Sequence, residues 1–199
     1  MTGVVREARH VYTTAEADKT PARDIQQLEM IPVGPLNSKH VATSISPWII
    51  TPDALEPYRR PARAKEHAVG PHLDDPDGKA LAVSVQVSVA SGNNKPVVVG
   101  HTTVQEMDWT FEQLVAHQSS AGCGMRTGDL LGIGTISGPG VDEQGCLLEE
   151  FVPGKTAKRG WLQDGESVEL VGYCGEGVGF GACIGTIQPT LDTSVWHSS

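Results

Sequence analysis

The clearest pattern of hydrophobic and polar positions lies between residues 81 and 104. Every second residue from Leu81 to Val89 is apolar, and small or polar residues lie between them. Such alternation is typical of a strand with one buried face. A turn-forming segment, SGNNKP, follows at residues 91–96, and a second apolar run extends from Val97 to Val104. The two runs therefore predict an antiparallel β-hairpin.

Three other apolar segments have the length and the neighbouring turn residues of strands. They are Leu130–Ser137, Ser167–Cys174 and Phe180–Gln188. Valine outnumbers leucine, which favours sheet, and the 23 glycines and 13 prolines favour frequent turns over long helices. The chain of 199 residues is therefore predicted to form one mainly β, α+β body.

Two short helices interrupt this β pattern. The segment Thr20–Met30 opens with a Thr-Pro pair, which suits the N-cap and the first helical position. A second helix is expected from Asp108 or Thr110 to near Gly122. Gln113 lies three residues after Thr110, which is the spacing of a capping box.

Proline and glycine mark the remaining segments as loops. Residues 31–52 contain four prolines and are predicted to be loop and short strand. Residues 53–80 are predicted to be a polar connection that ends in a surface turn at DDPDG, because the spacing of oxygen ligands does not match a calcium loop. The alternate glycines at 175–181 indicate a turn that lets backbones approach closely, since no helix follows as in a dinucleotide-binding loop.

The charge distribution limits the possible partners. The formal net charge of −9 arises in the second half of the chain, and an acidic surface repels phosphate backbones, so we expect no nucleic-acid partner. No apolar stretch is long enough for a membrane span, and the first ten residues do not resemble a secretion signal. These features predict a cytoplasmic protein.

Two groups of residues each have a structural and a functional interpretation. The basic residues Arg59, Arg60, Arg63 and Lys65 are interpreted as a solvated loop, with an anion site as the alternative. The four cysteines show no CxxC pair, and we interpret them as buried free thiols, against a metal or disulfide framework. They are Cys123, Cys146, Cys174 and Cys183.

Six segments in a fixed order together resemble the fumarylacetoacetase family. They are ARDIQQLEMIPVGPLNSK, TSISPWIITPDALEPYR, DWTFEQLVAHQSSAGCGMRTGDLLGIGTISGP, GCLLEE, LQDGESVELVGYC and GFGACIGTI. The resemblance implies a mixed β-sheet roll with one or two short helices, as in the C-terminal catalytic domain of that family. It divides the chain into a poorly ordered segment 1–17, an incomplete catalytic domain 18–190 and a tail 191–199.

The resemblance also implies a reaction. Members of the family hydrolyse a carbon–carbon bond of a β-diketone, converting fumarylacetoacetate to fumarate and acetoacetate in tyrosine and phenylalanine catabolism. A divalent cation, Mg²⁺ or Ca²⁺, polarises the keto oxygens. A His held by a carboxylate activates water, and cationic and amide donors stabilise the oxyanion.

Residues of this chain match several of the family's catalytic and metal positions. Arg23 and Gln26, which share one helical face, match the oxyanion donors. Lys39 and Thr43 match positions associated with the magnesium site and the oxyanion. Glu149 matches the carboxylate that orients the catalytic His. Arg23 as an exposed helix residue and Glu149 as a surface charge are the alternatives.

The substrate positions of the family are matched by Gln26, Met30 and Thr135. Met30 stands where the family usually has a tyrosine, which removes a phenolic hydrogen bond to substrate. Thr135 has the alternative of an ordinary strand hydroxyl. The substrate implied is a small β-diketone, and the partner implied is a second copy or a full-length relative.

One departure concerns the metal directly. Where family members usually read NDWSARDIQ, this chain reads DKTPARDIQ, so Lys19 replaces an aspartate ligand, and an ammonium repels a divalent cation. The family's catalytic His and most of its metal carboxylates belong to a region outside the resemblance. We therefore expect an impaired, truncated member. Alternatives are a non-catalytic remnant that dimerises or binds a full-length relative, and a tailoring hydrolase of a biosynthetic cluster.

Overall fold

The fold is known from a computed structural model, which describes 26, 28–34, 36, 38, 44–122, 124–147, 149 and 159–189. The predicted N-terminal segment 1–17 and the tail 191–199 lie outside the described residues. Among the described residues, every helix is too short or too polar to cross a lipid bilayer.

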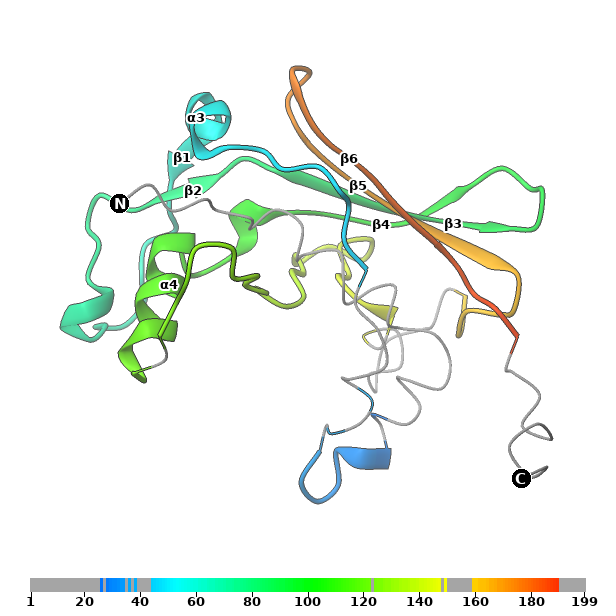
Figure 1. Ribbon diagram of the computed structural model, residues 1–199, viewed down its shortest axis with the longest axis horizontal. Coiled ribbons are helices and arrows are strands. Elements are labelled where there is room, and N and C mark those ends of the chain that lie inside the picture. Colours follow the sequence, from blue (N-terminus) through cyan, green and yellow to red (C-terminus); the bar gives the residue numbers. More distant parts are fainter. Residues whose placement is uncertain are drawn as a thin grey trace.

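A four-stranded antiparallel sheet forms the centre of the molecule (Figure 1). Its strands lie in the order β4-β3-β5-β6. They are β3 (Ser84–Ser91), β4 (Val97–Thr103), β5 (Glu166–Cys174) and β6 (Val178–Thr186). The predicted hairpin is therefore confirmed, as are two of the three further strands, and the mainly β class with short helices holds.

A separate two-stranded ribbon pairs β1 (Arg59–Pro61) with β2 (Lys79–Leu81). The alternating segment from Leu81 to Val89, predicted to be one strand, is therefore divided between β2 and β3 after Leu81. There the N–H of Ala82 donates to the carbonyl of Tyr58 at 2.9 Å, and β3 begins two residues later. The prediction of a simple connection over residues 53–80 was wrong in part, because it contains this ribbon.

Short helices complete the fold. They are α3 (Pro52–Leu55), the 3-10 turns η3 (Glu56–Tyr58), η4 (Pro71–Leu73) and η5 (Val104–Glu106), and α4 (Phe111–Ser120). The capping box of α4 is confirmed: the Thr110 hydroxyl accepts from the Gln113 N–H, and the Gln113 side chain accepts from the Thr110 N–H. The described part of the predicted helix Thr20–Met30, namely Gln26, Leu28 and Glu29, is also helical.

The hydrophobic core lies on one face of the sheet. Val85 and Val89 of β3, with Val168 and Leu170 of β5, are at most 6% exposed, as the alternating pattern predicts. Ile136 and Leu162, which belong to no strand, pack into the same cluster. The core therefore positions irregular segments as well as strands.

The cysteines follow their predicted role in part. Cys174 and Cys183 are buried free thiols, while Cys146 is partly exposed. Burial raises the pKa of the Cys174 thiol, because the apolar surroundings disfavour the thiolate. Cys123 lies outside the described residues.

The interpretation of the glycine-rich segment as a turn is confirmed in part: residues 175–177 connect β5 to β6, whereas Gly179 and Gly181 lie in β6. Gly175 has a φ of +54° and Gly181 a φ of +69°, both in the left-handed region that glycine adopts without strain. A Cβ at Gly177 would lie 2.8 Å from the Tyr58 hydroxyl. The atoms that come close to Gly177 and Gly181 belong to the side chains of Tyr58 and Trp48, so the expected close approach of backbones is not what these glycines serve.

The predicted strand Leu130–Ser137 was wrong. No residue of this segment pairs in a sheet, and Gly134 takes a φ of +76° in its middle. Its neighbours make their hydrogen bonds within a loop: the Gly138 N–H donates to the Glu143 carbonyl at 2.9 Å. The apolar pattern reflects single anchors such as Ile136, which is 4% exposed.

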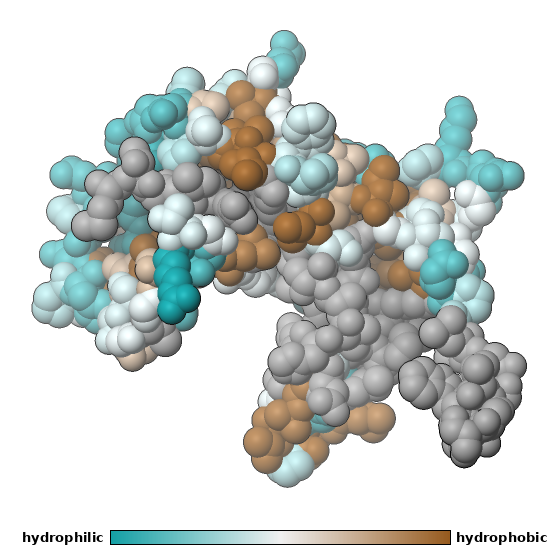
Figure 2. All heavy atoms as spheres, in the orientation of Figure 1, coloured by the Kyte–Doolittle hydropathy of each residue, from teal (hydrophilic) through white to brown (hydrophobic). Residues whose placement is uncertain are grey.

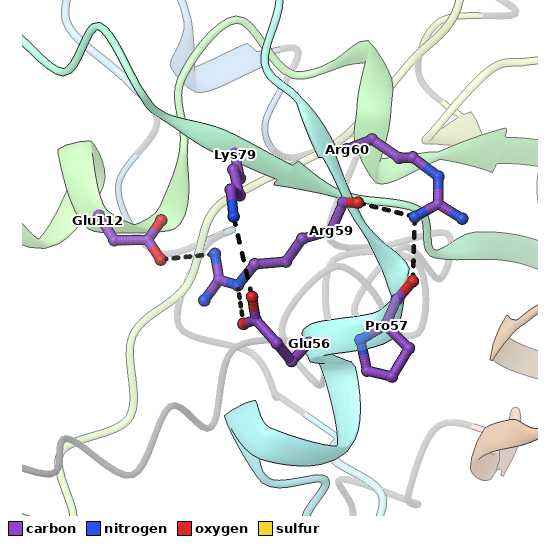
Figure 3. A network of polar contacts seen from close by, with 6 residues as sticks. All are labelled: Glu56, Pro57, Arg59, Arg60, Lys79 and Glu112. Atoms are coloured by element: carbon purple, nitrogen blue, oxygen red, sulfur yellow. Dashed lines mark hydrogen bonds and ion pairs between the residues drawn. The ribbon is translucent and has the colours of Figure 1, made fainter.

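The basic cluster is also more structured than the sequence suggested. Arg59 lies in β1 and donates to Glu56 at 2.8 Å and to Glu112 of α4 at 2.9 Å, while Lys79 of β2 approaches Glu56 at 3.9 Å (Figure 3). Partial burial of Arg59 would lower its pKa, but hydrogen bonds and charge attraction from Glu112 and Glu56 outweigh it and raise the pKa. The solvated-loop interpretation therefore fails for Arg59.

Candidate functional site

The described part of the candidate site centres on one loop, residues 135–149, which we call the site loop. Thr135 is exposed at its start, Ile136 anchors it in the core, and Glu149 ends it in a half-buried position. Glu143 closes a turn inside the loop by accepting from the Gly140 N–H at 2.8 Å. The loop thus holds two of the predicted site residues on a defined backbone.

A hydrogen bond links the two arms of the site loop at Glu149. The Ser137 hydroxyl donates to Oε1 of Glu149 at 2.6 Å, and the Gly145 N–H donates to the Ser137 oxygen at 3.2 Å. The Glu149 N–H in turn donates to the Cys146 carbonyl at 3.2 Å. This chain of bonds fixes one carboxylate oxygen of Glu149 and leaves the other as an acceptor.

The site loop also packs against the edge strand β4. The His101 N–H of β4 donates to the Asp142 carbonyl at 2.9 Å. A bulge lies here, because Val87 pairs with Gly100 whereas Ser88 pairs with Val98. A Cβ at Gly100 would lie 3.0 Å from the Gln144 carbonyl. The irregular edge of the sheet therefore receives the loop.

A glycine is needed where the two arms of the loop cross. A Cβ at Gly145 would overlap the carbonyl of Ile136 and would come within 2.5 Å of the Thr135 methyl group. Backbone atoms cannot move aside as flexible side chains do. Gly145 therefore sets the approach of Thr135 to the Glu149 arm.

Gln26 and Met30 lie in a second segment, residues 26–38. Gln26 is 8% exposed, and its carbonyl accepts from the Met30 N–H at 2.9 Å, whereas the Met30 side chain is 53% exposed. The Glu29 carboxylate accepts from the Leu36 N–H at 2.8 Å and from the Ser38 hydroxyl at 2.7 Å. These hydrogen bonds to Glu29 join the two ends of the segment.

The structure does not bring the two groups of predicted residues together. Figure 1 shows the segment 26–34, in blue, well below the green and yellow site loop. Within the described residues, no hydrogen bond joins Gln26 or Met30 to Thr135 or Glu149. Arg23, Lys39, Thr43 and Lys19 lie outside the described residues, so their proposed roles stay predictions.

The described residues do not supply a metal site. They contain no cluster of three or more His, Cys, Asp or Glu side chains able to hold an ion. Of the residues assigned to the magnesium region by resemblance, Lys39 carries an ammonium, which is no ligand for a cation, and Thr43 offers one neutral hydroxyl. Among the described residues, therefore, no donor set fits a divalent ion.

One residue of the site was missed in the sequence. The sequence pattern places Ser137 only at the end of a predicted strand, yet Ser137 is the hydrogen-bond donor to Glu149. Serine is common in turns and has no distinguishing spacing from Glu149, so only the folded loop identifies this pair.

Comparisons with known proteins agree with the resemblance seen in the motifs. The family model described as "Fumarylacetoacetate (FAA) hydrolase C-terminal" matches residues 7–188. The chain is 38% identical over 195 residues to fumarylacetoacetase of Aspergillus fumigatus and 38% identical over 193 residues to that of Arabidopsis thaliana. Against fumarylacetoacetase of Homo sapiens it is 35% identical over 196 residues.

The alignments cover a larger share of this chain than of its relatives. They include 92% of this chain in all three cases, but 45% of the Aspergillus protein and 46% of the Arabidopsis and human proteins. The chain therefore spans about half the length of the curated relatives it matches.

Proposed function

This chain belongs to the fumarylacetoacetate hydrolase family, and from that premise we propose that it carries part of the active site of a β-diketone hydrolase. The substrate proposed is fumarylacetoacetate or a closely related acylpyruvate, cleaved at a carbon–carbon bond during tyrosine and phenylalanine breakdown. The observation that supports this proposal most is the family match over residues 7–188. That range contains every residue to which we assign a role.

Glu149 is proposed to orient the imidazole that activates water. Its Oε1 already accepts from the Ser137 hydroxyl at 2.6 Å, which restrains that end of the carboxylate. Its second oxygen accepts no hydrogen bond among the described residues and can receive an imidazole N–H. A carboxylate held in this way keeps the His in the tautomer that accepts a proton from water.

Thr135 is proposed to contact the substrate from the same loop. Its side chain is exposed and lies next to the Gly145 backbone, close to the Ser137–Glu149 pair. Arg23, Gln26 and Lys39 are proposed to donate hydrogen bonds to the oxyanion that forms when water attacks the carbonyl. Their cationic and amide groups have the chemistry for this task. Because segment 26–34, which contains Gln26, lies away from the site loop (Figure 1), this role requires that segment to approach the loop when substrate binds.

The divalent ion of the family supplies Lewis-acid polarisation of the keto oxygens where it is bound. Because Lys19 occupies the position of an aspartate ligand, we propose that residues 1–199 alone hold this ion poorly and turn over slowly. The proposed unit is therefore a partial site.

The first test is a spectrophotometric assay of diketone loss with added magnesium, with the Arabidopsis enzyme measured in parallel. We expect turnover far below that of the full-length enzyme. Turnover near that of the relative would contradict the partial site but would support the proposed chemistry.

A binding measurement separates the two parts of the proposal. Acetylpyruvate, a small acylpyruvate, is titrated while the amide resonances of Thr135 and Ser137 are followed. We expect saturable shifts in the site loop that Glu149→Gln weakens and that Glu176→Gln, at an exposed turn position, leaves unchanged. An absence of shifts in the loop would refute the assignment of substrate to it.

A second candidate role, association with another copy or a full-length relative, has its own observation. Leu28, Ile31 and Val33 are 79%, 83% and 76% exposed. Figure 2 shows apolar side chains, in brown, at the end of the molecule where Figure 1 has segment 26–34. Such a patch is typical of interaction surfaces.

Light scattering tests this second role. We expect the chain to form oligomers that Ile31→Ser shifts toward monomer, while Leu130→Ser, at another exposed apolar position, has no such effect. A monodisperse monomer at high concentration would contradict it.

A further inference from the structure

A cavity of about 520 Å³ lies between segment 63–70 and the residues that precede α4. Its lining is mixed, and its size falls in the range typical of small-molecule sites. The apolar part is Ala64, Ala68, Val69 and Trp109, and the charged or titratable part is Arg63, Lys65, Glu66, His67 and Asp108. The residues that matter for the argument are Arg63, Lys65, Val69, Asp108 and Trp109. None of its lining residues belongs to the site loop or to segment 26–38, so this cavity is separate from the candidate hydrolase site.

Lys65 is the unusual group in this cavity. Its ammonium nitrogen is buried and has no hydrogen-bond partner in the part of the chain that the structure describes. The nitrogen lies 4.4 Å above the centre of the Trp109 ring. The ring face attracts the charge, but an ammonium has three N–H donors, and the indole face satisfies none of them as a full hydrogen bond. A buried cation with unmade hydrogen bonds favours an acceptor nearby.

The acidic neighbours are occupied by another cation. The guanidinium of Arg63 lies 3.7 Å from Oε2 of Glu106 and 3.7 Å from Oδ1 of Asp108, and it donates to the Glu106 carbonyl at 3.3 Å. Both of these carboxylates lie nearest to Arg63. Within the described residues, no carboxylate forms an ion pair with Lys65. The charged side chains that line the cavity balance formally, with Arg63 and Lys65 against Glu66 and Asp108, but the Lys65 nitrogen lies beside an aromatic wall with no hydrogen-bond partner among the described residues.

We propose that this cavity binds a small organic carboxylate with an apolar body. The carboxylate accepts hydrogen bonds from Lys65, and the apolar body lies against Trp109 and Val69. The flexible four-carbon stem of Lys65 lets the ammonium turn from the indole face toward a ligand in the cavity. A single negative charge fits better than a phosphate dianion, because Asp108 lines the same cavity and would repel the second charge.

The test uses benzoate as the probe, with benzamide as its neutral counterpart, at constant ionic strength. The readout is the indole N–H resonance of Trp109, assigned by its loss in Trp109→Phe. We expect a saturable shift with benzoate and affinity for benzamide that is lower by about tenfold or more, as for loss of a charge-assisted hydrogen bond. Equal affinity for the two probes, or shifts that do not saturate, would overturn the proposal.

Two lysine variants identify the anchor. Lys65→Gln keeps an extended polar side chain and removes the charge, and we expect it to weaken benzoate binding by about tenfold or more. Lys95→Gln, at an exposed turn position, should bind as the unmodified chain does. Binding by Lys65→Gln at unchanged affinity would refute the role of Lys65. If that variant unfolds, seen as collapse of the Trp48 and Trp161 indole resonances, the comparison of benzoate with benzamide on the unmodified chain decides the question.

Discussion

Glu166 and Glu149 are two carboxylates in very different surroundings. Glu166 is 8% exposed at the start of β5. Arg159 donates to both of its oxygens at 2.9 and 2.8 Å, the Gln163 N–H donates at 2.8 Å, and the Ser91 hydroxyl donates at 2.7 Å. Glu149 is half-buried and receives only the Ser137 hydroxyl among the described residues.

The contrast separates a structural carboxylate from one that is available for chemistry. Burial would raise the pKa of Glu166, but the hydrogen bonds from Arg159, Gln163 and Ser91 outweigh it and lower the pKa. All acceptor positions of Glu166 are used to join β3, β5 and the segment before β5. Glu149 is oriented by one donor and keeps an oxygen for another partner, as a residue that positions a base requires.

The largest effect is expected from Glu166→Gln. The substitution removes the negative charge that accepts both hydrogen bonds from the largely buried Arg159 guanidinium, which should lower the free energy of unfolding by about 3 kcal/mol. Urea denaturation measures this, with Glu176→Gln in the exposed turn as the control. A loss below about 1 kcal/mol would place Glu166 among ordinary surface charges.

Gly145→Ala should have the next largest effect, because it tests the backbone that supports Glu149. The new methyl group would overlap the Ile136 carbonyl, so we expect a loss of about 2 kcal/mol in unfolding free energy, as in overpacked sites. Gly124→Ala is the matched control, since a Cβ there meets nothing within 4 Å. Equal stability of the two variants would show that the loop arms do not cross as described.

Acid should reduce the difference between Glu166 and Glu149 in their contribution to the free energy of unfolding. The folded-state pKa of Glu166 is lowered, so its contribution is complete above the unfolded value of about 4.3 and is lost as pH falls through the folded pKa. The stability gap between the unmodified chain and Glu166→Gln should therefore narrow on going from neutral pH to about pH 3. Unfolding curves at both pH values check this, and a constant gap would contradict the origin proposed for the shift.

The smallest change in stability is expected at Glu149. Ser137→Ala removes one exposed hydrogen bond and Glu149→Gln removes the charge of its acceptor, so each should alter unfolding free energy by about 0.5 kcal/mol or less. The same variants should weaken acylpyruvate binding in the site loop. If Glu149→Gln destabilises the chain as strongly as Glu166→Gln, then Glu149 is a second structural carboxylate.

The sequence predicts those parts of the fold whose partners are local. The hairpin β3–β4 and the Thr110–Gln113 capping box are confirmed because alternation and a three-residue spacing act over short distances. The loop at residues 130–137 was misread because its course depends on Gly134 and on the crossing with Gly145. Apolar spacing alone does not distinguish such a loop from a strand.

The candidate site shows the same limit. The motifs identify Glu149 and Thr135, but the bond from Ser137 to Glu149 depends on a turn closed by Glu143. The basic cluster was likewise misinterpreted, because the partner of Arg59 is Glu112, 53 residues away, and that of Lys65 is the ring of Trp109. Contacts between segments that are distant in the sequence have no characteristic residue spacing, so a sequence pattern does not reveal them.

The position of β3 in the sheet also sets an expected order of assembly. It pairs with β4 across a short turn. Its other partner, β5, starts at Glu166, 69 residues after β4 starts at Val97, so all β3–β5 contacts are long-range. The hairpin should close first, at low entropic cost, and β5 should dock late. The site loop lies between β4 and β5 in the sequence. We therefore expect it to reach its final structure only when β5 docks. Pulse-labelling hydrogen exchange that protects Gly145 before β5 would contradict this sequence of events.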